Sequence, residues 1–251
     1  MTEPRCSARS LLATDTANEL AAGRGCLRAP ANLGNPYLAH RVSAGQQFDG
    51  MSIALAKGIA ARLGLALELV PFDSAPATLA ALLEERIDIA CLATDPSRQA
   101  IVAQTEPFIS VVAQWLARTE SGIARYEDID RDGCSVVVAR GTAYDLFVSR
   151  VFSRATVVRV DSQHDVFDVL TEGGYDVAAG MPMNFAKAPE GTGEYRRFSG
   201  GLHAIDQSLT CRKSCPSAAR FLEDYVSEMK ANGGLGRLRD AYRLADTFIP
   251  Q

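Results

Sequence analysis

The chain has 251 residues, of which 47% are hydrophobic and 22% are charged, and its formal net charge is −4. This composition is typical of a globular protein that buries a sizeable core. The sequence contains no basic stripe interleaved with aromatic residues and no apolar run of about 18 residues. We therefore expect neither a nucleic-acid partner nor insertion into a membrane.

Apolar runs alternate with helical patterns along the first half of the chain. The pattern predicts a strand over 27–33, a helix over 51–63 with apolar residues four apart, and a strand over 65–70. A helix over 76–85, a strand over 87–92 and a strand over 109–117 follow. This order is typical of βαβ units and predicts a parallel sheet with helices on both faces.

The alternation restarts after a polar stretch at 119–122, which we interpret as a crossover between two lobes. Strands are predicted over 135–139, 156–160 and 176–179, with helices over 142–152 and 162–171. A strand over 208–211 and helices over 216–230 and 236–245 end the chain. The sequence therefore predicts a second α/β lobe.

A helix start with an arginine in its first turn follows the strand predicted over 87–92. Asp95 can cap this helix, and Pro96 suits its first position. The backbone amides and the guanidinium of Arg98 would then converge on one point just past a strand end. Such a group of donors suits a carboxylate. The alternative is an exposed arginine on a surface helix.

A second helix start of this kind opens the second lobe. Gly141 permits a tight turn after a strand, and Thr142 offers a hydroxyl and an amide at the positive end of a helix. The alternative is a plain helix capped by threonine. Because ligands bind at the carboxyl ends of strands in α/β folds, the pair of helix starts predicts an anion site.

The six cysteines form no CxxC pair, and no histidine stands at zinc-finger spacing from them, so we expect no metal. Cys91 lies in an apolar strand candidate and is interpreted as part of the core. Cys211 and Cys215 flank the turn before a predicted helix. They leave two alternatives, a short-loop disulfide or two free thiols, and the sequence favours free thiols.

Six short segments in this order resemble the landmarks of the amino-acid-binding family of solute-binding proteins of bacterial ABC transporters: 48–50, 87–89, 105–108, 140–142, 174–177 and 229–233. The resemblance covers residues 26–244. It implies a type II periplasmic-binding fold, in which two α/β lobes joined by two crossovers trap a ligand between them. Lobe one would comprise 26–117 and 207–251, lobe two 118–206, and residues 1–25 an N-terminal extension. The resemblance implies a monomer without a cofactor.

The resemblance also assigns ligand contacts. Arg98 matches the arginine that holds the ligand's α-carboxylate, and Thr142 matches the helix-start residue that assists it. Further contacts are expected from Asn32, Asn35, Thr94, Gly141, Ala143 and Met181. The chain departs from the family at Asn35, where an aromatic residue is usual, at Ala143, where a second hydroxyl is usual, and at Met181, where the family commonly has an aspartate for the α-ammonium. A carboxylate with an apolar or amide-like remainder is therefore an alternative to an ordinary amino acid.

Two functions stay open from the sequence. The first is binding a small carboxylate for an ABC permease, with hinge closure on the ligand. The second is catalysis on the same fold, because cyclohexadienyl dehydratases resemble these proteins, and Asp95, Glu106 and Asp145 are the available acids. A sensing lobe of a receptor is a third interpretation, which is less favoured. The family implies a periplasmic location, whereas residues 1–25 are too polar for a signal peptide, so a cytoplasmic location is the alternative.

Overall fold

The computed structural model describes residues 8–42 and 47–250. Two compact units are present, and each is described by itself. Unit one contains the described residues up to Ile109 together with Gln207–Ala245 and the segment from Ile249, and unit two contains Ser110–Asp206 and Asp246–Phe248. Residues 1–7 of the predicted extension lie outside the described residues. The sequence-based lobes divide the chain at other points and remain a prediction.

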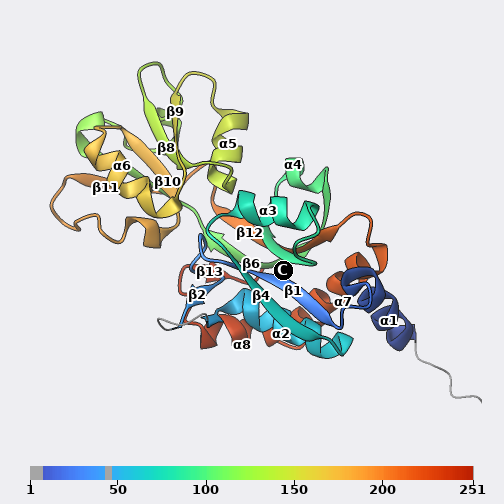
Figure 1. The fold of residues 1–251 in the computed structure, drawn as a ribbon. Helices are drawn as coiled ribbons and strands as arrows, with labels where there is room; N and C mark the ends of the chain where they lie inside the picture. The colour runs from blue at the N-terminus through green and yellow to red at the C-terminus, as the bar shows by residue number, and fades with distance from the viewer. Residues whose placement is uncertain (1–7, 43–46, 251) are drawn as a thin grey trace, which may run out of the picture. The chain divides into compact units, whose positions relative to one another are not determined.

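Unit one consists of strands with helices packed against them (Figure 1). Strands β1 and β4 pair in parallel, and β12 pairs with β5 in antiparallel orientation. The elements in chain order are α1 (Ala8–Ala21), β1 (Cys26–Asn32), β2 (His40–Arg41), β3 (Phe48–Asp49), α2 (Met51–Leu63), β4 (Ala66–Phe72), α3 (Ala75–Leu83), β5 (Ala90–Ala93), α4 (Pro96–Gln99), β6 (Val102–Val112), β12 (Ala204–Arg212), α7 (Pro216–Ala231) and α8 (Gly234–Ala241). Strands β6 and β12 each continue into unit two.

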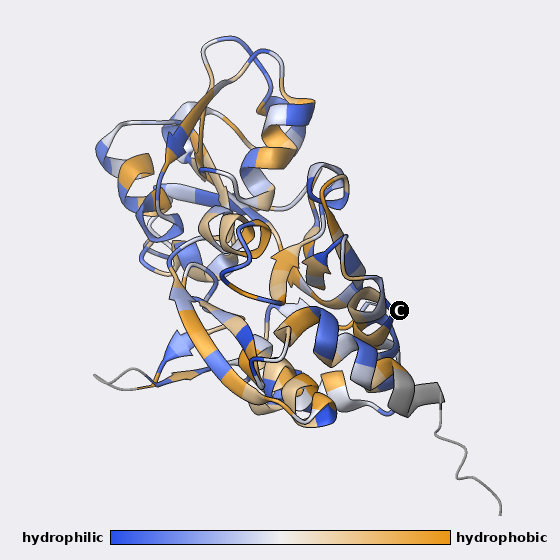
Figure 2. Ribbon diagram, turned by 45° about the vertical axis from the view of Figure 1, so that its right-hand side comes forward, coloured by the Kyte–Doolittle hydropathy of each residue, from blue (hydrophilic) through white to orange (hydrophobic). Residues whose placement is uncertain are grey.

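Successive residues of β5 and of the segment before it face two different cores. Ile89 and Cys91 belong to a cluster with residues of α2 and α7, whereas Ala90 and Leu92 belong to a cluster with residues of α3. This alternation follows from the two-residue period of a strand. Figure 2 shows that helices of the structure carry both hydrophobic and hydrophilic residues. The helices predicted on both faces and the core position of Cys91 are confirmed in unit one. The predicted parallel sheet is confirmed only in part, because β1 and β4 pair in parallel whereas β5 pairs with β12 in antiparallel orientation.

The helix predicted over 51–63 is confirmed as α2, and its two ends are set by glycines. Gly64 adopts the left-handed conformation with φ 66° and ends the helix. Gly50 has φ 139°, and a Cβ atom there would lie 2.2 Å from the carbonyl oxygen of Leu38. Only glycine fits at position 50, so this landmark residue has a structural role.

Asp49, beside Gly50, connects the start of α2 to the end of α8. Its Oδ1 accepts the Gly50 amide at 2.9 Å and the Tyr242 hydroxyl at 2.8 Å. Burial and the Asp49 carboxylate raise the pKa of Tyr242 to about 12. The Phe48–Asp49 landmark thus joins two parts of unit one that are far apart in the sequence.

Helix α1, which lies in the predicted extension, is part of the folded unit one. The Thr16 hydroxyl donates to the Ser217 carbonyl at 3.1 Å. The Glu19 carboxylate accepts the Ser217 amide at 3.2 Å and the Ala218 amide at 2.9 Å. Because the N-cap residue Cys215 makes no side-chain cap bond, Glu19 supplies the negative charge at the start of α7.

Cys211 and Cys215 are buried free thiols. The Sγ atom of Cys211 lies 3.9 Å from the carbonyl oxygen of Cys215. Burial raises the pKa of the Cys211 thiol to about 12, so this thiol is protonated at neutral pH. The free-thiol alternative is confirmed.

Unit two contains a five-stranded sheet in the order β11-β7-β10-β8-β9. Strand β8 pairs in parallel with β9 and β10, and β7 pairs in antiparallel orientation with β10 and β11. The elements are β7 (Gln114–Arg118), η1 (Thr119–Ser121), η2 (Tyr126–Asp128), β8 (Ser135–Ala139), α5 (Ala143–Val151), β9 (Thr156–Val160), η3 (Gln163–Asp165), α6 (Val166–Glu172), β10 (Val177–Gly180), η4 (Pro182–Phe185), β11 (Tyr195–Phe198) and β13 (Thr247–Phe248). The predicted second α/β region is confirmed.

The strand predicted over 109–117 is wrong as a single element. It is divided between β6, which begins at Val102, and β7. The chain leaves the first ladder at Ala113, whose amide donates to the His203 carbonyl at 3.0 Å. The polar stretch that follows forms the short helix η1. Among the described residues, no helix is long and apolar enough to cross a membrane.

The carboxylate of Asp88, just before β5, has no solvent exposure and joins three segments of unit one. It accepts Nη2 of Arg24 and Nη2 of Arg28, each at 2.7 Å, and the Arg28 amide at 2.8 Å. The Asp88 amide in turn donates to the Arg28 carbonyl at 2.9 Å. Asp88 therefore holds the start of β5 against β1 and the segment that follows α1.

We expect Asp88→Asn to lower the free energy of unfolding by about 3 kcal/mol, because two guanidinium groups lose a buried counter-charge. Urea denaturation at neutral pH measures the change. The matched control is Asp132→Asn, which breaks an ion pair of the same length, 2.7 Å, with exposed Arg154. The control should leave the free energy of unfolding nearly unchanged, because both of its partners are exposed to water. Equal effects of the two substitutions would contradict the structural role of Asp88.

A second prediction concerns alkaline pH and Tyr242. Its pKa in the folded state is about 12, above the ordinary tyrosine value of about 10. The stabilisation that Tyr242 contributes is complete below pH 10 and is lost as the pH rises toward 12, because the unfolded chain gives up its proton first. Urea unfolding at pH 8 and 11 should show that Tyr242→Phe costs more stability at pH 8. An equal loss of stability at both pH values would count against the hydrogen bond between Asp49 and Tyr242.

Candidate ligand-binding site

The start of α4 places Arg98 as the sequence predicts. Asp95 is the N-cap, its Oδ1 accepting the amide of Ser97 at 2.9 Å and its hydroxyl at 2.6 Å, and Pro96 occupies the first turn. Arg98 itself is only 3% exposed. The alternative of an exposed surface arginine is therefore wrong.

The guanidinium of Arg98 lies at the carboxyl end of β5. Its Nη1 donates to the carbonyl of Ala93, the last residue of that strand, at 2.9 Å. Burial lowers the pKa of Arg98, and the charge of Asp95 opposes this shift. A buried guanidinium interacts strongly with an anion because water does not screen the charge.

Polar side chains from β6, from β12 and from Thr94, the residue after β5, support this position. Thr94 and Ser208 share a hydrogen bond of 2.8 Å between their hydroxyls. The Nε2 of Gln104 lies 3.3 Å from the Ala93 carbonyl oxygen, which also accepts Arg98, and 3.4 Å from the Thr210 hydroxyl. Gln104 is absent from the predicted contacts because no strand was predicted over 102–108. Residues 102–105 are Val-Ala-Gln-Thr, which do not alternate between apolar and polar, so periodicity gave no signal for this part of β6.

The loop after β1 holds two of the predicted contact residues. Asn32 is 5% exposed, and its Oδ1 accepts the Gly34 amide at 3.2 Å. The Asn35 amide donates to the Asn32 carbonyl at 3.2 Å. A Cβ atom on Gly34 would lie 2.5 Å from the Asp73 carbonyl oxygen, so the loop packs tightly against the end of β4. The loop is held in one conformation by these contacts.

Strands β1 and β5 contact each other in unit one. The amide of Arg28 donates to the Asp88 carboxylate at 2.8 Å, and the Asp88 amide donates to the Arg28 carbonyl at 2.9 Å. Asn32 ends β1 and Asn35 follows it, whereas Thr94 and Arg98 follow β5.

In unit two, Thr142 caps α5 as predicted. Its Oγ1 accepts the Asp145 amide at 3.4 Å and donates to the Ala139 carbonyl at 2.7 Å. The hydroxyl proton is thus engaged within the protein. Ala143 is the first residue of the helix, and Gly141 turns the chain with φ 65°. An incoming anion would meet the backbone amides of this first turn rather than the hydroxyl.

Asp145 has a larger role than the first-turn charge inferred from the sequence. Its Oδ2 accepts the Gly141 amide at 2.8 Å. Its Oδ1 accepts Nε of Arg159 at 2.8 Å and the Ser149 hydroxyl at 3.1 Å. The carboxylate therefore fixes the Gly141 turn and is neutralised by Arg159.

Met181 lies at the carboxyl end of β10 and is 3% exposed. Its amide donates to Oδ1 of Asn184 at 2.8 Å, and the same oxygen accepts Nε2 of Gln163 at 3.1 Å. The position that commonly carries an aspartate in the resembling family thus carries a buried, uncharged thioether.

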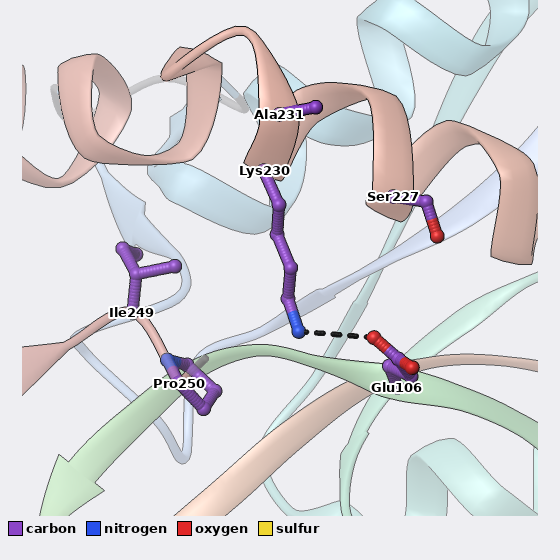
Figure 3. A pocket seen from close by; sticks show the side chains of 6 residues that line it. All are labelled: Glu106, Ser227, Lys230, Ala231, Ile249 and Pro250. Carbon is purple, nitrogen blue, oxygen red and sulfur yellow. Dashed lines mark hydrogen bonds and ion pairs between the residues drawn. The ribbon is translucent and has the colours of Figure 1, made fainter.

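Two pockets lie apart from these residues. The first, of about 500 Å³ in unit one, is crossed by the ion pair between Lys230 Nζ and Glu106 Oε2 at 3.2 Å (Figure 3). This ion pair joins two of the landmark segments, 105–108 and 229–233. The second, of about 380 Å³ in unit two, is lined by Gln114, Pro182, Met183, Ala186, Glu190, Arg197 and Asp246. Neither pocket is lined by a residue predicted to contact the ligand.

The fold has close counterparts among solved structures. The arginine-bound form of truncated ArgBP from T. maritima is 26% identical with a TM-score of 0.68, and the match covers 83% of this chain and 98% of that chain. A putative binding component of an ABC transporter from Wolinella succinogenes, complexed with lysine, is 23% identical with a TM-score of 0.72 and coverages of 87% and 95%. An ancestral amino-acid-binding protein, a precursor of cyclohexadienyl dehydratase, is 20% identical with a TM-score of 0.73 and coverages of 88% and 96%.

Among curated protein sequences, none matches the chain. The family model of the bacterial extracellular solute-binding proteins, family 3, matches residues 34–245. This range contains both helix starts, Arg98 with its cap, the Gly141 turn and Met181. The chain belongs to the bacterial extracellular solute-binding proteins of family 3 and has their two-lobe α/β fold of the periplasmic-binding-protein type.

Proposed function

We propose that this solute-binding protein takes up a small carboxylate, an amino acid or a close analogue, and delivers it to an ABC permease. The observation that carries the proposal is Arg98, whose buried guanidinium is held at a strand end by the Ala93 carbonyl beside the capped start of α4. Two N–H groups of a guanidinium can grip one carboxylate, and the surrounding protein reduces screening of the charge.

The remaining contacts follow from the residues assigned by the family resemblance. In unit one the proposal includes Asn32, Asn35 and Thr94, which stand at the ends of β1 and β5. In unit two it includes Gly141, Thr142, Ala143 and Met181, which stand at the ends of β8 and β10. Thr142 would act through the helix start that it caps, because its hydroxyl proton already goes to Ala139.

Arginine is the reference ligand for testing this proposal. A structure 26% identical to this chain is an arginine-bound ArgBP. Nothing at position 181 repeats the aspartate expected for an α-ammonium, so we propose that the carboxylate is recognised more strongly than the amine. Acids without an α-amino group belong to the same proposed ligand class.

We propose that the chain is not an enzyme. Each acid considered for the dehydratase alternative has a structural role. Asp95 caps α4, Glu106 pairs with Lys230 at 3.2 Å, and Asp145 holds Gly141 and Arg159. A general acid must be placed to give its proton to the substrate, whereas these three carboxylates are engaged by neighbouring groups of the protein.

The family description supports a location outside the cytoplasm. The similar structure of a putative binding component of an ABC transporter supports an ABC permease as the partner. We propose a periplasmic site of action, with the chain acting as a soluble carrier of its ligand. Localisation of the tagged protein by cell fractionation tests this part independently of ligand identity.

Arg98→Ala should weaken binding of L-arginine by about ten- to a hundredfold, the scale of lost charge-assisted hydrogen bonds. Isothermal titration calorimetry measures the change. Arg98→Lys keeps the positive charge but not the planar fork, so it should recover only part of the affinity.

Arg86→Ala is the matched control, because Arg86 is half exposed and pairs with Glu84 on the surface of unit one. It should bind L-arginine as the wild type does. Circular dichroism of each variant shows whether it is folded. A folded Arg98→Ala variant with unchanged affinity for a ligand that the wild type binds would contradict the carboxylate assignment.

The uncharged residue at position 181 predicts weak discrimination at the amine. The test is a thermal-shift panel with L-arginine, L-lysine and the same acids without the α-amino group, 5-guanidinopentanoate and 6-aminohexanoate. All four should stabilise the wild type, and the affinity for each amino acid should be no more than about tenfold higher than that for its amine-free counterpart. Strong stabilisation by the amino acids together with none by the amine-free acids would show that the inference from Met181 is wrong.

A further inference from the structure

Unit one contains a carboxamide oxygen that is buried without a hydrogen-bond partner among the described residues. It is Oδ1 of Asn35, in the loop after β1. A buried carbonyl oxygen without a partner destabilises the protein relative to one that is hydrogen-bonded. Such an acceptor in a binding-protein loop indicates a place for an N–H donor.

The backbone around Asn35 is fixed, so the side chain has little freedom to find another partner. The Asn35 amide donates to Asn32, and the Asn35 carbonyl accepts the amides of Leu38 and Ala39 at 2.9 and 3.1 Å. The Leu38 carbonyl then accepts both the amide and the hydroxyl of Ser52 in the first turn of α2. The loop is therefore preorganised before a ligand arrives.

Asn35 and Arg98 follow the ends of two strands, β1 and β5, that contact each other. Asn35 is bonded back to Asn32, the last residue of β1, and Arg98 is bonded back to Ala93, the last residue of β5. Asn35 offers an acceptor and Arg98 offers donors. In an α-amino acid the nitrogen is one carbon away from the carboxylate, so a ligand held by Arg98 presents its amine near its carboxylate end.

We propose that Oδ1 of Asn35 accepts an N–H of the ligand's α-amino group and so provides in unit one the amine contact that Met181 does not provide. This inference rests on the proposed function and adds a specificity-determining residue: Asn35 makes acids that bear an α-nitrogen with at least one hydrogen bind more tightly than acids without one. Because the acceptor is a neutral amide, it recognises the N–H without requiring a charge on the nitrogen.

This role explains why the chain has asparagine at position 35, where the family usually has an aromatic residue. A carboxamide exchanges apolar contact area for one directional acceptor. A single neutral hydrogen bond changes affinity by about five- to tenfold, which agrees with the weak discrimination expected from position 181. The two departures from the family pattern are thus complementary.

The test measures affinities of the wild type and of Asn35→Ala by calorimetry for two pairs: L-arginine with 5-guanidinopentanoate, and L-lysine with 6-aminohexanoate. For the pair that binds the wild type better, we expect about a tenfold preference for the amino acid. Asn35→Ala should reduce that preference to about one, because it weakens binding of the amino acid more than binding of the amine-free acid. Asn35→Asp should increase the preference above the wild-type value.

Asn18→Ala is the matched control, because Asn18 lies exposed on α1 of the same unit, and it should keep the wild-type preference. An Asn35→Ala variant that keeps the preference, or that weakens both members of a pair equally, overturns the role of Asn35 while leaving carboxylate binding intact. Failure of all four compounds to bind the wild type overturns the proposed function itself, and this inference with it.

Discussion

The buried ion cluster around Asp88 is the constraint on which the arrangement of unit one depends. A carboxylate without solvent contact is tolerated only with cationic partners, and Arg24 and Arg28 come from the segments that the fold must bring together. By joining the starts of β1 and β5, the cluster also sets where the strands end. The positions of Asn32 and Ala93, and of the polar residues bonded back to them, follow from an interaction at the opposite end of the strands.

The fold was predictable wherever a local signal coincided with the tertiary arrangement. Helix α2 lies where its four-residue apolar period and Gly64 predicted it, and α7 begins at Pro216 as expected. The continuous apolar run over 109–117 carried no sign of the break at Ala113, because that break depends on the distant carbonyl of His203. Hydrogen bonds between residues far apart in the sequence set the ends of such strands, and the periodicity of the local sequence does not reveal them.

The candidate site shows the same division. Asp95 as a cap, and Arg98 just behind it, follow from local chemistry and were predicted. The hydrogen-bond partner of each polar atom was not predicted. The Thr142 hydroxyl donates to the Ala139 carbonyl, and the Gly141 amide donates to Asp145. Residue types indicate which donors a loop could offer, whereas the folded structure decides which of them are already engaged. Ligand selectivity therefore depends on what the protein leaves unpaired.

The contact between Glu19 and the start of α7 shows that the segment shared with the family is shorter than the segment that folds together. The family model begins at residue 34, after β1, yet α7 within the matched range takes its N-terminal counter-charge from α1, which precedes it. Trimming the chain to the recognisable segment would remove a strand beside β4 and expose the amides of Ser217 and Ala218. Sequence similarity delimits what relatives share, whereas cooperative folding extends to every segment that satisfies a buried group.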